Sequence, residues 1–172
     1  MRLNEMVNAA KKHGFGEKII RELEFIYEAM NREVYHEIER QFVEKLDALL
    51  TEEQRLLLWE YGGGCRGGER RKLAIALSYE LAGKPLSEKI ELMNQNELMY
   101  KAHLNEDGTI TVYCDWYCMH HRKKMPSAYG CSAGAALHVI EIALRVKAKI
   151  KSIDYPQEGN EKQNMSFIIE IV

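Results

Sequence analysis

Hydrophobic positions in the first half of the chain recur at helical spacing. Between Ile19 and Leu46 apolar residues fall three or four positions apart, with charged residues between them. This pattern predicts an amphipathic helix of about eight turns. A stripe this long has two interpretations: part of it packs on a second subunit, or an unrecognised kink breaks the helix. The first interpretation predicts a homodimer that forms through the long helix.

Shorter helices are predicted around this stripe. Thr51 and Gln54 have the spacing of a capping box, in which each side chain accepts a hydrogen bond from the other residue's backbone N–H. The helix that follows is expected to stop at the glycines that begin with Gly62. Further helices are predicted from the N-cap Asn4 to Gly14, over about 69–81, and after the N-cap Ser87.

The hydrophobic period changes in the second half of the chain. Ile110, Val112 and Cys114 alternate with more polar residues after an Asp-Gly turn, which predicts a β-hairpin with Cys114 facing inward. Ser132 is a predicted N-cap for a helix. After this helix, a strand is expected to place Ser152 on its apolar face, and a closing strand completes a second hairpin.

These elements predict an α+β fold in a single domain spanning residues 1–172. Residues 1–95 are expected to be mainly helical. They would pack on a small antiparallel sheet, built from residues 96–172 as two hairpins with an intervening helix.

Composition narrows the function classes. The 172 residues include 24 Lys and Arg against 26 Asp and Glu, a formal net charge of −2. Nonspecific nucleic-acid binding needs a basic surface, so no nucleic-acid partner is expected. No apolar stretch approaches the ~20 residues that span a bilayer, so no membrane partner is expected either. The polar start of the chain is unlike a signal peptide, which predicts a cytoplasmic protein.

Four cysteines are the main candidates for chemistry. They fall in predicted loops or near the ends of predicted elements, where side chains can converge. Four thiolates fit tetrahedral zinc, and an imidazole can replace one of them. Burial as structural cysteines and a role as a catalytic thiol are the alternatives. The candidate zinc ligands are Cys65, Cys114, Cys118 and Cys131.

Cys131 also supports a catalytic interpretation. It precedes a run of small residues at a predicted helix start, where backbone amides stabilise a thiolate. His120 and His121 are the candidate bases. The corresponding activity is a hydrolase or lyase acting on a small C–N or C–S substrate, with Cys131 or a zinc-activated water as nucleophile. The alternative is that Gly134 and Ala135 only allow the helix to pack closely on the sheet.

Other residues near the cysteines are candidates for binding a ligand. Arg66 lies in a glycine-rich loop and suits a carboxylate. Aromatic side chains in the cysteine region suit an apolar pocket. The candidates in this region are Trp116, Tyr117, Tyr129 and Ser132.

The last ~75 residues resemble a known family. The hairpin with cysteines, the segment Tyr129-Gly130-Cys131-Ser132-Ala133-Gly134, the helix to Leu144, and the closing strand 165–171 carry the resemblance. They are similar to the 4-vinyl-reductase-type small-molecule-binding domain, to related bacterial proteins with a Cys-Ser-x-Gly helix start, and to the thiazoline-carboxylate hydrolase-like group. The resemblance implies helices before an antiparallel sheet, a ligand pocket between them, and zinc-binding cysteines. The segment 155–167 lacks the cysteines usual in the family's closing hairpin.

Three functions follow as hypotheses. The first is a small-molecule-binding domain, dimeric through the long helix, in which a cysteine cluster holds zinc. The second is the hydrolase or lyase described above. The third is a structural or regulatory partner protein that acts through the long helix.

Overall fold

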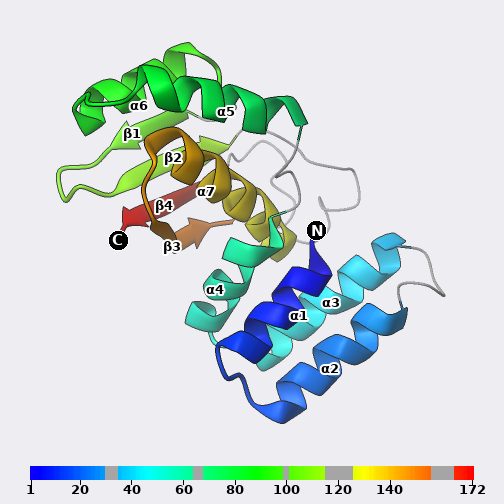
Figure 1. The fold of residues 1–172 in the computed structure, drawn as a ribbon. Coiled ribbons are helices and arrows are strands. Elements are labelled where there is room, and N and C mark those ends of the chain that lie inside the picture. The colour runs from blue at the N-terminus through cyan, green and yellow to red at the C-terminus, as the bar shows by residue number, and fades with distance from the viewer. Residues whose placement is uncertain (30–34, 64–67, 99–100, 115–125, 156–164) are drawn as a thin grey trace.

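Helices dominate the first half of the chain, and the strands all lie in the second half (Figure 1). The computed structural model describes residues 1–29, 35–63, 68–98, 101–114, 126–155 and 165–172. The predicted α+β class is confirmed. The helices are α1 (Leu3–Lys12), α2 (Glu17–Glu28), α3 (Tyr35–Leu49), α4 (Glu52–Gly62), α5 (Gly68–Glu80), α6 (Leu86–Gln95) and α7 (Gly130–Leu144), with the 3-10 helix η3 (Pro126–Tyr129) before α7. The strands are β1 (Lys101–Leu104), β2 (Ile110–Cys114), β3 (Ala148–Asp154) and β4 (Met165–Ile171).

The four strands form one antiparallel sheet in the order β1-β2-β4-β3. Each predicted hairpin is present, and the two hairpins join where β2 pairs with β4. Phe167 lies at the middle of this arrangement, because it pairs with Val112 on one side and Ile153 on the other. Both β1 and β3 are edge strands.

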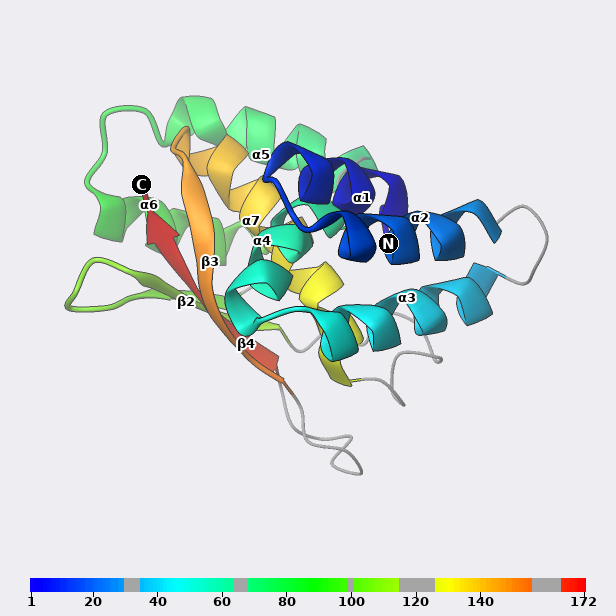
Figure 2. The same ribbon diagram turned by 90° about the horizontal axis from the view of Figure 1, so that it is seen from below.

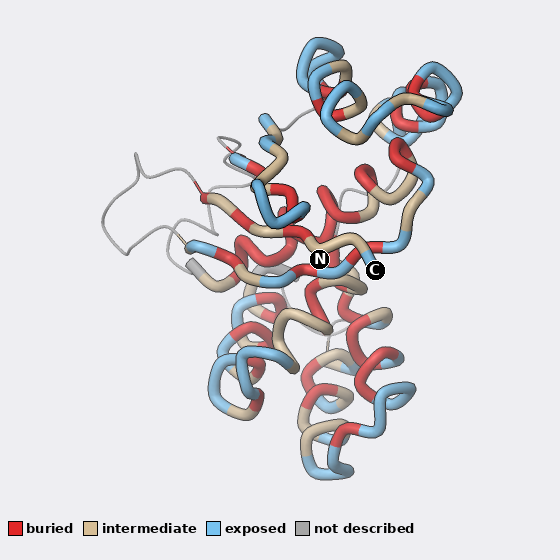
Figure 3. Tube along the Cα trace, turned by 90° about the vertical axis from the view of Figure 1, so that its left-hand side faces the viewer, coloured by how far each residue is buried: buried red, intermediate tan, exposed pale blue. Residues whose placement is uncertain are grey.

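Helix α7 packs against the sheet and against two of the other helices. It contacts β3 on one side and α4 and α5 on the other, so nearly all of its residues are buried. The segment Ser127–Leu144 is long and apolar enough to cross a membrane, but 78% of it is buried inside the protein. Its apolar surface is therefore used in packing the core. Figure 3 shows the buried positions gathered in the middle of the molecule, with exposed positions along the outer helices.

The sheet has one buried face and one open face. Along β2 and β4 the buried positions alternate with partly exposed ones, as in Ile110 and Thr111. Tyr113, on the face opposite the core, keeps 48% of its surface exposed. The helices lie on the buried side of the sheet, opposite the face that carries Tyr113 (Figure 2). This one-sided burial agrees with the alternation in the sequence.

A β-bulge changes which residue of β3 faces the core. The register passes from Ile150 opposite Ile169 to Ser152 opposite Ile168, which leaves Lys151 as an extra residue. After this bulge Ile153 is buried and Ser152 is only partly buried. The expectation that Ser152 continues the apolar face was therefore wrong, because strict alternation ends at the bulge.

The long apolar stripe forms two helices. Helix α2 ends at Glu28, α3 begins at Tyr35, and the two helices contact one another within the chain (Figure 1). The interpretation of a broken helix is confirmed. Among the described residues of the stripe, Leu23, Ile26, Ile38, Phe42 and Leu46 are buried within the chain, on two helices in place of a single long one. Dimerisation itself stays a prediction.

Side chains cover the outer edges of the sheet. At β1, the Asn94 amide of α6 donates to the Ala102 carbonyl and accepts from the Ala102 N–H, each at 2.8 Å. At β3, Glu60 of α4 accepts from the Ile150 N–H at 2.8 Å, and Glu141 of α7 accepts from the Ala148 N–H at 3.2 Å. These bonds satisfy backbone groups that an edge strand would otherwise leave to solvent.

Candidate functional site

The structure describes part of the predicted site. It places Cys114, Tyr129, Cys131 and Ser132, and each of these residues is buried. The remaining predicted site residues lie outside the described residues, so their roles stay predictions. These residues are Cys65, Arg66, Trp116, Tyr117, Cys118, His120 and His121.

Cys114 lies at one end of the sheet. It is the last residue of β2 and pairs with Met165, the first residue of β4. The next residue of β4, Ser166, pairs with Asp154 at the end of β3. The exit of β2, the exit of β3 and the entry of β4 therefore meet at this end. The inward orientation predicted for Cys114 is confirmed, since only 5% of its surface is exposed.

The start of α7 lies at the same end of the sheet. Tyr155 follows β3 and lies beside Trp59 of α4, while burial raises the pKa of the Tyr155 phenol. The Trp59 indole in turn packs on Gly130, the first residue of α7. Cys131 comes next and is 2% exposed. The two described cysteines are therefore both buried at one end of the sheet.

The small residues of α7 serve close packing on α4. A Cβ atom on Gly134 would lie 1.9 Å from the Trp59 carbonyl oxygen, and one on Gly130 would lie 2.3 Å from the Trp59 indole nitrogen. Gly63 approaches the backbone of α7 just as closely, at Gly134 and Ala135. The close-packing interpretation is confirmed, although the partner of these glycines is α4 and the prediction named the sheet.

The local structure around Cys131 differs from the predicted helix start. Ser132 is not the N-cap, because α7 begins at Gly130 and its N-cap is Tyr129. Tyr129 itself has helical dihedral angles (φ −65°, ψ −14°) as part of η3. A nucleophile has to reach its substrate, so the catalytic interpretation requires that the buried Cys131 thiol becomes accessible. It stays a prediction.

Zinc binding depends on residues outside the described ranges. Within those ranges, no three or more His, Cys, Asp or Glu side chains are grouped to hold a metal ion. Cys114 and Cys131 supply two thiols at one end of the sheet, and structural zinc needs four ligands. The zinc site therefore stays a prediction.

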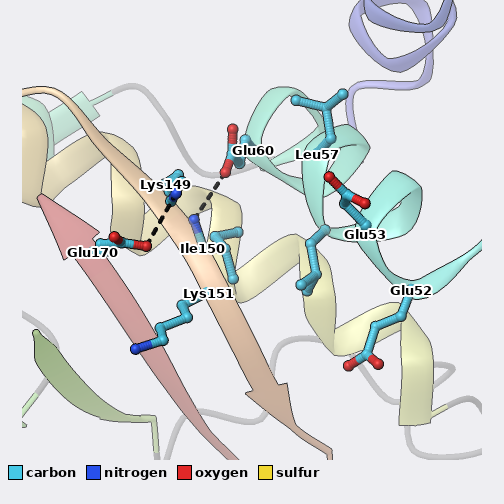
Figure 4. A pocket seen from close by; sticks show the side chains of 9 residues that line it. Glu52, Glu53, Leu57, Glu60, Lys149, Ile150, Lys151 and Glu170 are labelled. Atoms are coloured by element: carbon cyan, nitrogen blue, oxygen red, sulfur yellow. Dashed lines mark hydrogen bonds and ion pairs between the residues drawn. The ribbon is translucent and has the colours of Figure 1, made fainter. Parts of the chain in front are cut away.

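A groove lies between α4 and β3, with a volume of about 510 Å³ (Figure 4). This volume is within the range of small-molecule sites. Its wall on α4 carries carboxylates and leucines, and its wall on β3 carries two lysines. We call it the α4–β3 groove. It is lined by Glu52, Glu53, Leu56, Leu57, Glu60, Lys149, Ile150, Lys151 and Glu170.

One hydrogen bond joins α4 to β3, and a capping box fixes the start of the helix. The predicted capping box is confirmed: Gln54 N donates to Thr51 Oγ1 at 3.3 Å, and Thr51 N donates to Gln54 Oε1 at 3.1 Å. This cap fixes the first turn of α4, where Glu52 and Glu53 lie. Near the other end of α4, the bond from Glu60 to the Ile150 N–H joins the helix to the strand.

Glu60 is a half-buried acid of the groove. Its pKa is raised above 4.5, first because burial disfavours the charged carboxylate and also because Glu141 lies nearby. The Ile150 N–H and the Lys149 ammonium act in the opposite direction. The folded protein therefore binds the Glu60 proton more tightly than the unfolded chain does.

We expect Glu60→Gln to stabilise the protein more at neutral pH than at acid pH. A raised folded-state pKa contributes stability below the unfolded pKa, and this contribution is lost as pH rises through the folded pKa. Glutamine has no ionisable group but keeps an oxygen that accepts from the Ile150 N–H. Urea unfolding of both proteins at about pH 4 and pH 7 measures the difference. An equal effect of the substitution at both pH values would contradict the raised pKa.

Sequence reasoning missed the α4–β3 groove. The capping box located the start of α4, and the alternating lysines of β3 were visible as the polar face of a strand. The contact between Glu60 and Ile150 joins residues 90 positions apart, and no local pattern encodes such a pairing. A local signal that could have indicated the groove is the position of Glu60, an acid on a helix with several apolar residues.

Searches against protein-family models, curated proteins and solved structures find no match. The resemblance to the 4-vinyl-reductase-type domain therefore stays a prediction.

Proposed function

We propose that this chain is a small-molecule-binding domain and that the α4–β3 groove is its ligand site. The observation that carries the proposal is the groove itself. It combines a volume of about 510 Å³ with three apolar side chains, Leu56, Leu57 and Ile150, and six charged ones. In ligand sites, apolar surface supplies affinity and polar groups orient the ligand, and the groove offers both kinds of side chain.

Binding in the groove can be detected through its own side chains. We would label the methyl groups of leucine and isoleucine and screen a library of cationic, neutral and anionic fragments by NMR. Ligands are expected to shift the methyl signals of Leu56, Leu57 and Ile150. Hits that shift only methyl groups elsewhere would overturn the groove as the ligand site.

A pair of matched variants separates the groove from other surfaces. Leu57→Phe adds volume inside the groove and is expected to abolish binding. Leu73→Phe makes the same change on α5, where 38% of the leucine surface is exposed, and is expected to leave binding unchanged. Equal binding by both variants would overturn the proposal.

A second candidate is a zinc site at the end of the sheet where β2 ends and α7 begins. It is supported by the burial of both Cys114 and Cys131 at this end. Cys118 follows Cys114 by four positions, and Cys65 follows Gly63, which packs on α7. Bound zinc would stabilise the fold by holding these segments together.

Metal analysis of the purified protein tests this second candidate. About one zinc per chain is expected, together with thiols that react only after a chelator is added. Cys118→Ser is expected to lose the zinc. The thiol titration needs no variant, so it remains decisive where the substituted protein fails to fold. Native thiols that react equally with and without chelator would contradict the site.

A further inference from the structure

Helix α5 is apolar on every side but packs mainly on one side. The run Leu73-Ala74-Ile75-Ala76-Leu77 covers more than one turn, so it places apolar side chains all around the helix. Figure 1 shows α5 at the outside of the molecule, and its main contacts are with α7. Ala74 and Leu77 are buried on that inner side. A helix that is apolar all round normally has neighbours all round, so the outer side of α5 suits a further contact.

Exposed large apolar side chains are concentrated on α5. Among the described residues six such side chains are exposed, and three of them belong to α5: Leu73 at 38%, Ile75 at 37% and Tyr79 at 70%. Ala76 is exposed between them. Large apolar side chains that are exposed together mark interaction surfaces. We call this surface the outer face of α5, and it consists of Lys72, Leu73, Ile75, Ala76, Tyr79 and Glu80.

The charged residues of the outer face are placed symmetrically about Ala76. Lys72, Ala76 and Glu80 are four residues apart, so they form one row along the helix. Lys72 and Glu80 lie on either side of Ala76, each about 6 Å away along the axis. Two copies of α5 packed antiparallel with Ala76 at the crossing would therefore place Lys72 of each chain level with the partner's Glu80. Two-fold symmetry forms this pair twice, so the row is complementary in charge to a second copy of itself.

The side chains of this row and beside it are suited to a contact between helices. Ala76 is small, which allows two helix axes to approach closely. The Tyr79 ring is already held in place, because the Arg145 guanidinium lies 4.6 Å from its centroid and donates to Ser78 Oγ at 3.3 Å. An aromatic side chain that is exposed and already ordered loses little entropy on binding. Lys72 pairs with Glu69 at 2.7 Å, but these side chains are 74% and 88% exposed, and such a surface pair is easily exchanged.

We propose that the outer face of α5 is the contact surface of a homodimer, in which two copies of α5 pack antiparallel across a two-fold axis at Ala76. Lys72 of each chain pairs with the partner's Glu80, and the apolar side chains Leu73 and Tyr79 pack beside these pairs. A second copy fits this face because the face carries both the lysine and the acid that the contact needs. The inference concerns assembly and does not depend on whether the α4–β3 groove binds a ligand.

Charge reversal with rescue tests the pairing. Sedimentation equilibrium at protein concentrations up to about 1 mM measures the dissociation constant of the dimer. Lys72→Glu and Glu80→Lys are each expected to weaken the dimer about tenfold, because each sets like charges against one another at two symmetric places. The double variant exchanges the two charges and is expected to return the dissociation constant to within about threefold of the original. Single variants that dimerise as tightly as the original chain, or a double variant that is no tighter than the single ones, would overturn the proposal.

Two further variants test where the contact lies. Ala76→Arg puts a long charged side chain at the crossing point and is expected to leave only monomer. Lys18→Glu reverses the same charge as Lys72→Glu at an exposed position on α2, and the dimer is expected to stay unchanged. Circular dichroism and thermal unfolding confirm that each variant folds, which is expected because the substituted side chains are exposed. An original chain that stays monomeric at about 1 mM, or a dimer that persists in Ala76→Arg, would show that the outer face of α5 does not form the contact.

Discussion

Gly134→Ala is expected to lower the free energy of unfolding by about 2–3 kcal/mol. The new Cβ would lie 1.9 Å from the Trp59 carbonyl oxygen, so α4 and α7 would have to move apart. The atom in the way belongs to the backbone and cannot rotate aside. This cost exceeds the ~1 kcal/mol by which alanine favours a helix over glycine. Chemical denaturation by urea measures the change.

Gly16→Ala is the control for this substitution. No atom lies within 4 Å of a Cβ built on Gly16, and its φ of −56° suits an alanine. We expect a change of less than about 1 kcal/mol, the usual range for an alanine at an N-cap. If Gly134→Ala lowers the free energy of unfolding no more than Gly16→Ala does, the close contact between α4 and α7 is contradicted.

Phe167→Ala is expected to have the largest effect on stability, a loss of about 3–5 kcal/mol. Phe167 is 1% exposed and lies on the central strand β4, so its removal leaves a cavity between the sheet and the helices. Its neighbour Ile168 lies on the open face of the sheet and is partly exposed. Ile168→Ala is expected to cost about 1 kcal/mol or less.

Thermal and urea unfolding of both alanine variants measure this difference. The two positions are adjacent in sequence and share the same strand, so strand propensity affects them similarly. The two positions differ in burial, because Phe167 lies on the core face of the sheet and Ile168 lies on the open face. Losses of equal size at both positions would show that the open face is covered in solution.

Much of the fold could be predicted from hydrophobic period alone. Alternation over Ile110, Val112 and Cys114 gave the inner face of β2, and the Asp-Gly turn gave its hairpin. The capping box of Thr51 and Gln54 gave the start of α4. Each of these signals is local, because the responsible atoms lie within a few residues of one another.

The rest of the fold depends on contacts between distant residues. Helices α2 and α3 share one apolar stripe, and a stripe looks the same whether the helix continues or turns back on itself. One extra residue, Lys151, moves Ile153 to the core face in place of Ser152. The sequence of β3 contains no residue that makes this bulge obligatory.

The candidate site was the least predictable part. Cys114 and Cys131 are both buried, and the convergence of the four cysteines on one metal stays a prediction. The α4–β3 groove depends on how a helix from the first half lies against a strand from the second half. That placement is set by tertiary packing around Trp59, Gly130 and Gly134, which only a three-dimensional structure reveals.

The side chains at the edges of the sheet have a consequence for assembly. A strand from another molecule could extend the sheet at β3 only by displacing Glu60 and Glu141 from Ile150 and Ala148. At β1 it would have to displace Asn94 from Ala102. The fold therefore resists domain swapping and fibril growth at both edges. Among the described elements, the helices and the open face of the sheet are the surfaces that remain for a homodimer contact.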